Sequence, residues 1–251
     1  MTSVRGPAAW LALAVALLSS VPAPERDRGH GTGTLIAAFV TKTEVLLCSD
    51  GRVVNSTNGS TVRDDWPKVH RLTDRSGLLA AGRDLPGLLG QFERKLGAQR
   101  PDAVSAVASV VRGSLEAEWA GLAGRSGQTP AGRAFTVVAG FDADGAARLF
   151  FMDSASRPPF HLEQVGLFGA GQDLEVFAIA SNSGANEDVS ALLVRNLEAL
   201  VRQQPGADRR RLMLSAFNAA KEELGRRNSS IGGATFAARI TPQAGFERIE
   251  P

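Results

Sequence analysis

The sequence predicts an α+β fold, a four-layer αββα sandwich in which two antiparallel sheets stack face to face and helices cover their outer sides. Predicted strands come in groups, whereas a doubly wound parallel sheet would alternate single strands with helices. Several strands are nearly continuous apolar runs, which is typical of strands buried on both faces. Between and after these groups lie segments with the apolar spacing of helices.

The first predicted strand, Thr34 to Thr41, is entirely apolar between its two threonines. Lys42-Thr43 makes a tight turn into a second apolar run, Glu44 to Ser49. Together they predict a β-hairpin that is buried on both faces. The following segment, Asn55 to Ser60, is rich in Asn, Ser, Thr and Gly and therefore predicts a turn.

Two further strands, Lys68 to Leu72 and Gly77 to Ala81, are expected before the first helices. Asp84 belongs to the residue types that favour an N-cap, so we expect a helix from there to Leu96. A second helix is predicted by an apolar stripe at helical spacing. Its members are Val104, Val107, Ala108, Val111, Leu115 and Trp119.

A second hairpin is predicted over Ala134 to Phe141 and Ala147 to Asp153. The connecting segment Asp142-Ala143-Asp144-Gly145 is a strong hairpin signal. One more strand is expected at Gln164 to Phe168. No helix interrupts this group of strands, which favours an antiparallel sheet.

The C-terminal part contains two predicted helices, Val189 to Val201 and Met213 to Leu224, each with one apolar face. Pro205-Gly206 separates them. A final strand is expected at Gly233 to Ile240, and a short one at Phe246 to Ile249. We find no repeats and no low-complexity linker, so a single mature domain is the simplest interpretation.

Composition excludes several kinds of site. Lys and Arg number 28 against 26 Asp and Glu, and no basic tail or stripe marks a nucleic-acid binder. The single cysteine, Cys48, excludes an internal disulfide framework and lies in an apolar run, where a buried small hydrophobe is expected. His30, His70 and His161 are scattered, so neither a metal site nor a cofactor is predicted.

The N-terminus has the pattern of a secretory signal peptide. Arg5 precedes an apolar stretch from Ala8 to Leu18, and small residues around Ala23 offer a cleavage site. The stretch is short for a transmembrane helix, which needs about 20 apolar residues. We therefore expect export, with an uncleaved membrane anchor as the alternative.

The domain organisation follows from this pattern: residues 1–23 form the signal peptide, 24–33 a polar propeptide or spacer, and 34–251 the folded domain. Once the signal is removed, no other segment is expected to span a membrane. The protein would be periplasmic or secreted.

The most informative stretch is Gly31-Thr32-Gly33-Thr34-Leu35, with Asp50 following 16 positions after Thr34. It resembles the start of mature proteasome β subunits and of the related bacterial two-component protease. Those begin at a threonine preceded by glycine and reach an Asp-containing motif at that distance. The resemblance continues in order through Pro67-Lys68-Val69-His70-Arg71-Leu72, Ala80-Ala81-Gly82, Phe92-Glu93-Arg94-Lys95-Leu96, Val137-Val138-Ala139-Gly140-Phe141-Asp142 and Ser230-Ile231-Gly232-Gly233.

The resemblance implies an exported member of the N-terminal nucleophile (Ntn) hydrolase superfamily with a proteasome-like fold. Thr34 would become the nucleophile after autocatalytic cleavage, with its own α-amino group, pKa about 7.7–8.0, as the base. Lys68 would push that amine toward its neutral form, and Asp50 would hold Lys68 charged and oriented. The Gly82 backbone N–H would stabilise the oxyanion.

The implied substrate is a peptide or a small amide, and a homo-oligomer stays open. Thr32 competes with Thr34 for the role of mature N-terminus, because Gly31-Thr32 is also a Gly-Thr junction. Its distance of 18 residues to Asp50 would need two extra residues in the hairpin, so the spacing favours Thr34.

The sequence also departs from the family pattern. Ala170 occupies the place of a serine that usually bonds the terminal amine, and Arg83 that of a second glycine. Asp50 to Lys68 is two residues longer than usual, and the family's later Asp and Ser partners find no match. A catalytically inactive exported structural or binding module is therefore the main alternative. A serine or cysteine hydrolase has little support, because no Gly-x-Ser-x-Gly motif is present.

Overall fold

The computed structural model describes residues 34–55, 59–82, 86–126, 133–168, 172–181 and 189–250. The predicted signal peptide, residues 1–23, and the predicted spacer, residues 24–33, lie outside these ranges. No helix within the described ranges has both the length and the apolar character needed to cross a bilayer.

The first sheet has five strands in the order β10-β1-β2-β11-β12, and all neighbouring strands are antiparallel. The predicted N-terminal hairpin, β1 and β2, lies near its centre, and β11 from the end of the chain pairs with β2. The bounds are Thr34–Val40 for β1, Val45–Asp50 for β2, Glu175–Ser181 for β10, Thr235–Thr241 for β11 and Gly245–Ile249 for β12.

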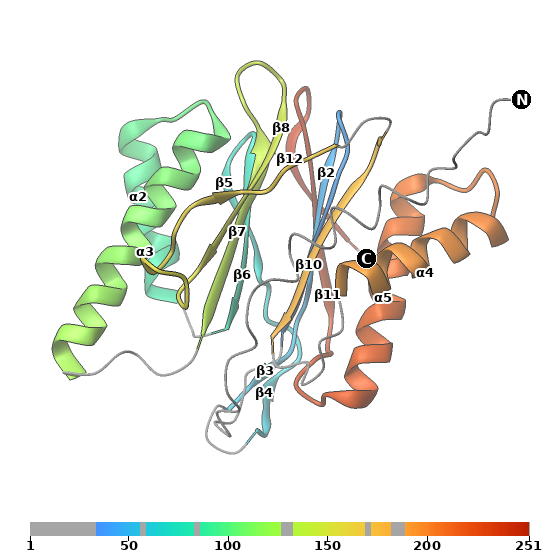
Figure 1. The fold of residues 1–251 in the computed structure, drawn as a ribbon, viewed down its shortest axis with the longest axis horizontal. Coiled ribbons are helices and arrows are strands. Elements are labelled where there is room, and N and C mark those ends of the chain that lie inside the picture. The colour runs from blue at the N-terminus through green and yellow to red at the C-terminus, as the bar shows by residue number, and fades with distance from the viewer. Residues whose placement is uncertain are drawn as a thin grey trace, which may run out of the picture.

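The second sheet is an antiparallel meander in the order β5-β6-β7-β8-β9. Its bounds are Val69–Thr73 for β5, Ser76–Gly82 for β6, Ala134–Phe141 for β7, Ala147–Asp153 for β8 and Glu163–Gln164 for β9. A small separate hairpin, β3 (Val53–Val54) and β4 (Thr61–Arg63), projects from one end of the molecule (Figure 1).

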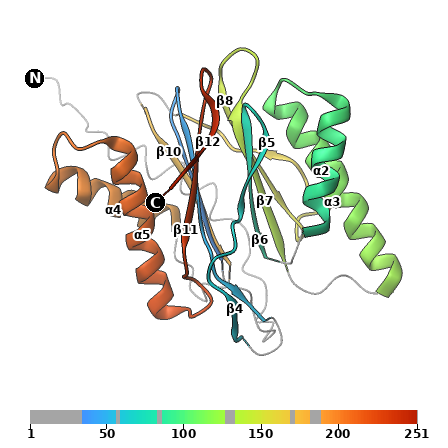
Figure 2. The same cartoon turned by 180° about the vertical axis from the view of Figure 1, so that it is seen from behind.

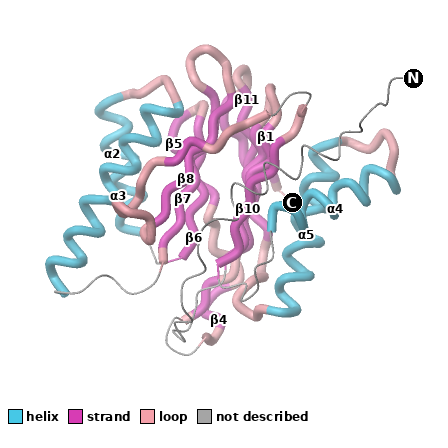
Figure 3. Tube along the Cα trace, viewed as in Figure 1, coloured by secondary structure: helices cyan, strands magenta, loops and turns pink. Residues whose placement is uncertain are grey.

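A pair of helices covers the outer side of each sheet, as Figure 1 and the reverse view in Figure 2 show. Figure 3 separates these helices from the strands by colour. The bounds are Pro86–Gln99 for α2, Val104–Ser126 for α3, Val189–Gln203 for α4 and Arg209–Arg227 for α5. The predicted α+β class with antiparallel sheets is confirmed, and the order of layers is compatible with the predicted sandwich.

The β1 strand shows why the first sheet lies inside. Leu35 and Phe39 pack toward α4 and α5, whereas Ile36 and Val40 pack between the two sheets. All four side chains have no exposed surface. Successive side chains of a strand point to opposite faces, so a continuous apolar run suits burial on both faces, as predicted.

The predicted helical stripes also face the sheets. Leu115 and Trp119 of α3 belong to the apolar cluster under the second sheet, together with Phe92 of α2. Met213 and Leu224 of α5 belong to the cluster under the first sheet. These helices therefore bury the apolar faces that their periodicity indicates.

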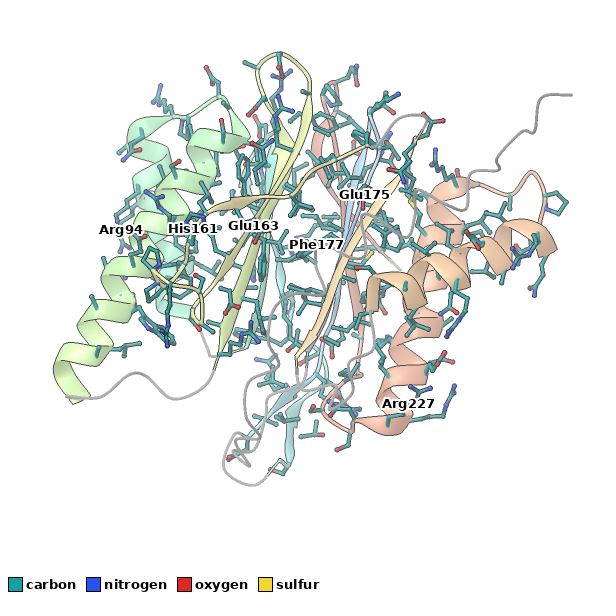
Figure 4. The ribbon with its side chains drawn as sticks, in the orientation of Figure 1. Arg94, His161, Glu163, Glu175, Phe177 and Arg227 are labelled. Carbon is teal, nitrogen blue, oxygen red and sulfur yellow. The ribbon has the colours of Figure 1, made fainter. Side chains whose placement is uncertain are left out.

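The short strands β3 and β4 were not predicted, and neither was the longer strand β10. It pairs with β1 along its whole length, from Thr34 opposite Ser181 to Val40 opposite Glu175. Phe177, labelled with Glu175 in Figure 4, reaches the opposite sheet, where its ring centroid lies 5.5 Å from that of Phe151. Because its partner β1 lies far upstream, no local hairpin signal marks β10.

The prediction of a strand at Gln164 to Phe168 is correct only for Gln164, its first residue. The ladder with β8 covers only Glu163–Gln164, and the Val165 N–H adds one further bond to the Leu149 carbonyl at 2.9 Å. Phe168 has a φ of 61°, in the left-handed region, which is incompatible with a continuing strand.

Gly140 offers a test of the packing between β7 and the β5–β6 turn. A Cβ at this position would lie 2.0 Å from the Arg75 carbonyl oxygen and 2.8 Å from the Ser76 Cα. We expect Gly140→Ala to lower the free energy of unfolding by about 1–3 kcal/mol or more, because backbone would have to move. The measurement is the urea midpoint.

The matched control is Gly113→Ala on α3, where an added Cβ meets nothing within 4 Å. Alanine should there raise the free energy of unfolding by up to about 1 kcal/mol, the difference in helix propensity. Equal effects of the two substitutions would contradict the packing argument.

Candidate active site

Thr34 begins β1 and lies at one end of the first sheet. Its side chain is buried, with 3% of the residue exposed, and its Oγ1 accepts a hydrogen bond from Lys68 Nζ at 3.1 Å. In the full chain the Thr34 nitrogen belongs to a peptide bond. A free amine at Thr34 therefore exists only after cleavage before this residue. The contact between its hydroxyl and the Lys68 ammonium is present without that cleavage.

Lys68 precedes β5 in the second sheet, and only 7% of the residue is exposed. Its ammonium contacts Asp50 Oδ1 at 2.7 Å, the Arg52 carbonyl at 2.7 Å and Thr34 Oγ1 at 3.1 Å. A lysine ammonium has three N–H donors, so these three acceptors use all of them. The ammonium is consequently fixed in one orientation.

Asp50 ends β2 and has no exposed surface. Its Oδ1 accepts from Lys68 and from the Leu35 backbone N–H at 3.1 Å, and its Oδ2 accepts from the Gly232 N–H at 3.0 Å. The carboxylate thus joins the β1–β2 hairpin, the second sheet and the turn before β11. A buried charge needs such partners to be stable in the folded protein.

Burial is the largest influence on both charged groups. It raises the pKa of the Asp50 carboxyl, while Lys68 and the N–H groups of Gly232 and Leu35 lower it. It lowers the pKa of the Lys68 ammonium, while Asp50 raises it. The charge-assisted hydrogen bonds favour the ionised form of both partners, so we treat them as an ion pair.

Further hydrogen bonds join the turn before β11 to the residues that follow β2. The Gly232 carbonyl accepts from the N–H groups of Gly51 and Arg52, at 3.2 and 3.0 Å. The Arg52 guanidinium bonds Asp64 at 2.6 Å and the Ser229 carbonyl at 2.8 Å. The resemblance in the sequence includes this turn, but neither the turn nor Arg52 was predicted to be part of the site.

Gly82 ends β6, near Lys68 but outside the hydrogen bonds that join the other three predicted site residues. The Ala80 N–H, two positions earlier, donates to the Lys68 carbonyl at 3.1 Å. Gly82 has a φ of +91°, and a Cβ there would lie 2.0 Å from the Arg133 carbonyl oxygen. Only glycine suits this position.

Other predicted features are placed as follows. Cys48 is fully buried, and burial raises the pKa of its thiol, so it has no nucleophilic character. Within the described ranges no group of His, Cys, Asp and Glu could hold a metal ion. Arg83, the Asp84 cap and Gly169-Ala170-Gly171 lie outside those ranges.

A groove of about 870 Å³ lies away from this cluster. It is lined by the β5–β6 and β11–β12 turns, including Arg75 and Gln243, and by the end of α2 with the segment after it. These turns lie at the opposite ends of the strands that carry the cluster. None of Thr34, Asp50 and Lys68 lines it. The groove and the cluster are therefore separate features of the structure.

Comparison with known proteins adds no family assignment: no protein-family model matches the chain, and no curated protein matches it. The function has to be inferred from the geometry of the cluster. That geometry is a buried hydroxyl at the start of a strand, an oriented ammonium beside it and a buried carboxylate behind the ammonium. Such an arrangement can activate a hydroxyl nucleophile if a base is also present.

The ion pair predicts a large effect of Lys68→Met, which removes the charge and keeps much of the side-chain volume. The Asp50 carboxylate would stay buried without its cation, so we expect a loss of about 3–5 kcal/mol in the free energy of unfolding at pH 7. The Asp50→Asn/Lys68→Met double variant should recover part of this loss. The measurement is urea unfolding of the wild-type protein and of both variants.

The loss in Lys68→Met should depend on pH. Without the lysine, the folded-state pKa of Asp50 rises further above its unfolded value of about 3.9. Folding then binds a proton, so the variant loses stability as the pH rises through that window and is least affected below pH ~4. A loss that is independent of pH between 3 and 8 would contradict the assignment of a buried ion pair.

Proposed function

We propose that this chain is an exported, proteasome-like Ntn hydrolase that cleaves amide or peptide bonds once Thr34 is its N-terminal residue. The observation that carries the proposal is the contact of Thr34 Oγ1 with the Lys68 ammonium at 3.1 Å, while the same ammonium is paired with buried Asp50 at 2.7 Å. These residues are 34 and 18 positions apart along the chain. The layered α+β fold is compatible with this superfamily.

The reaction would proceed in two steps. Thr34 Oγ1 attacks the substrate carbonyl carbon, and its proton passes to the free Thr34 α-amine. The C–N bond then breaks, the leaving amine takes that proton, and an ester remains on Thr34. Water, deprotonated by the α-amine, attacks the ester and releases the acid and the threonine hydroxyl.

Lys68 would act through its positive charge. A cation beside the α-amine disfavours a second positive charge there, so it lowers the pKa of the amine and increases its neutral fraction. The ammonium is held in place, because all three of its N–H groups are bonded. Asp50 keeps this ammonium charged and oriented.

Gly82 would supply the oxyanion donor. Its backbone N–H lies on the strand that pairs with the Lys68 segment, at the same end of the sheet. One such donor is worth about 2.7–4 kcal/mol of transition-state stabilisation in comparable hydrolases. Because the second sheet holds this backbone in place, no side chain is needed for that role.

The substrate would be a peptide or a small amide, handled outside the cell interior if the predicted signal peptide is functional. The chain could act alone or as a homo-oligomer. The alternative is an inactive structural or binding module. Such a module would not require cleavage before Thr34.

Maturation gives the most direct test. As long as residues precede Thr34, its nitrogen is an amide and cannot serve as a base, so full-length protein should be inert. Signal peptidase cutting near Ala23 leaves about ten residues on the threonine, and a second cut at Gly33-Thr34 is required. Intact mass, N-terminal sequencing and amide hydrolysis should show the cut and the activity appearing together.

The controls are Thr34→Ala, which should abolish both processing and activity, and Thr32→Ala, which should spare both. These two threonines lie two residues apart, each after a glycine, so they form a matched pair. A mature protein that keeps residue 24 as its N-terminus, or a Thr34→Ala variant with full activity, would favour the inactive module.

The processed protein should have a bell-shaped pH profile. Activity rises as the α-amine loses its proton, at or below its usual pKa of about 7.7–8.0 because Lys68 lies beside it. Activity falls as Lys68 loses its proton, because the positive charge 3.1 Å from Thr34 Oγ1 then no longer favours release of the hydroxyl proton. Burial places the pKa of this lysine below its usual 10.5. We therefore expect the alkaline limb of kcat/KM below pH 10.5.

Lys68→Arg separates the two limbs. An arginine stays protonated to a pH above ~12, so the alkaline limb should disappear while the acidic limb stays. An unchanged alkaline limb in Lys68→Arg would show that another group causes it.

A further inference from the structure

A second lysine, Lys221 on α5, reaches the end of the first sheet that carries Thr34. Its Nζ lies 2.8 Å from the Gly233 carbonyl and 2.6 Å from Thr235 Oγ1, and the residue is half-buried. Thr235 Oγ1 donates in turn to Asn218 Oδ1 at 2.6 Å. Two residues of α5 therefore hold the segment that enters β11. Figure 1 shows α5 beside β11.

That segment is also the one that contacts the proposed site. The Gly232 N–H, one residue before Gly233, donates to Asp50 Oδ2 at 3.0 Å. Thr235 stands directly opposite Asp50 in the β2–β11 ladder. Lys221 is thus linked to the Asp50 carboxylate in two ways. It bonds Gly233, next to the residue that bonds Asp50, and it bonds Thr235, which is paired with Asp50 across the strands.

The charges around Lys221 come from three places. Asp50 of β2 attracts its ammonium, Arg52 after β2 repels it, and Glu222 on its own helix attracts it. Asp50 is itself paired with Lys68 of the second sheet. The buried Asp50 carboxylate therefore interacts with two lysines. Lys68 is hydrogen-bonded to it, and Lys221 of α5 attracts it through its charge.

We infer that Lys221 is a positioning residue of the proposed site: it holds the Gly232–Gly233 turn against Asp50 and places a second positive charge on the helical side of that carboxylate. This inference rests on the proposed function for its kinetic consequence. Its electrostatic consequence, a change in the titration of Lys68, holds whether or not the protein is an enzyme.

The test compares Lys221→Met, Lys221→Arg and the control Lys95→Met. Lys95 of α2 also bonds a serine hydroxyl, that of Ser114 at 2.9 Å, but on the far side of the second sheet. For each variant we would measure kcat/KM of the processed protein against pH, the urea midpoint, and the titration of Lys68 by NMR of ¹³C-labelled lysine, assigned with Lys68→Arg.

Removal of a nearby positive charge raises the pKa of a neighbouring amine. In Lys221→Met the acidic limb of kcat/KM should therefore move up by about half a pH unit or more, a roughly threefold loss of kcat/KM below the limb. The Lys68 titration should move up as well. Lys221→Arg should restore both, and Lys95→Met should change neither.

A purely structural lysine would give a different result. If Lys221→Met lowers the urea midpoint but leaves the acidic limb and the Lys68 titration in place, the inference is overturned. It is also overturned if Lys221→Arg shifts both as far as the methionine does. If the processed wild-type protein is inactive, the proposed function fails, and the Lys68 titration alone still decides the role of Lys221.

Discussion

The carboxylate of Asp50 has no exposed surface, and a charge in that position is stable only when every side of it is occupied. Its partners come from three separate parts of the chain: the β1 backbone at Leu35, the Lys68 ammonium from the second sheet and the Gly232 N–H before β11. The two sheets and the C-terminal turn must therefore meet at one point. The position of Thr34 is a consequence of this meeting, because its hydroxyl bonds the same ammonium.

The layered arrangement explains how this meeting point is buried. β1 and β2 lie inside the first sheet, with helices on one side and the second sheet on the other, so water is excluded from both faces. In such surroundings electrostatic interactions are stronger than in water, and an unpaired charge is correspondingly costly. The same burial that makes the ion pair necessary also gives Lys68 a strong effect on any amine beside it.

Local patterns in the sequence predicted the elements that carry their own signal. The β1–β2 and β7–β8 hairpins have tight turns, and the helices have apolar stripes, so each could be found from a few neighbouring residues. β10 was missed although Val176 to Ala180 is an apolar run like that of β1; only its pairing with a strand about 140 positions upstream lacks a local signal. Nothing within its seven residues indicates that partner.

The site divides in the same way. Thr34, Asp50 and Lys68 were found together only through an ordered resemblance to a family, since nothing local links residues so far apart. The Gly232 contact spans 182 positions, and Lys221 approaches Asp50 only because α5 packs against β1 and β2 and bonds the start of β11. A lysine near the C-terminal end of a helix is usually a solvated residue, so the sequence offered no reason to choose this one.

The pairing of β1 on both sides has a consequence for any cut made just before it. New chain ends normally fray, because their last residues lose the neighbours that ordered them. Here Thr34 lies opposite Ser181 on one side, and Leu35, next along β1, is tied by its N–H to Asp50 and paired with Ala180. A terminus created at Thr34 would remain anchored up to its first residue, so little conformational entropy would be gained by the cut and little would have to be lost again at each turnover.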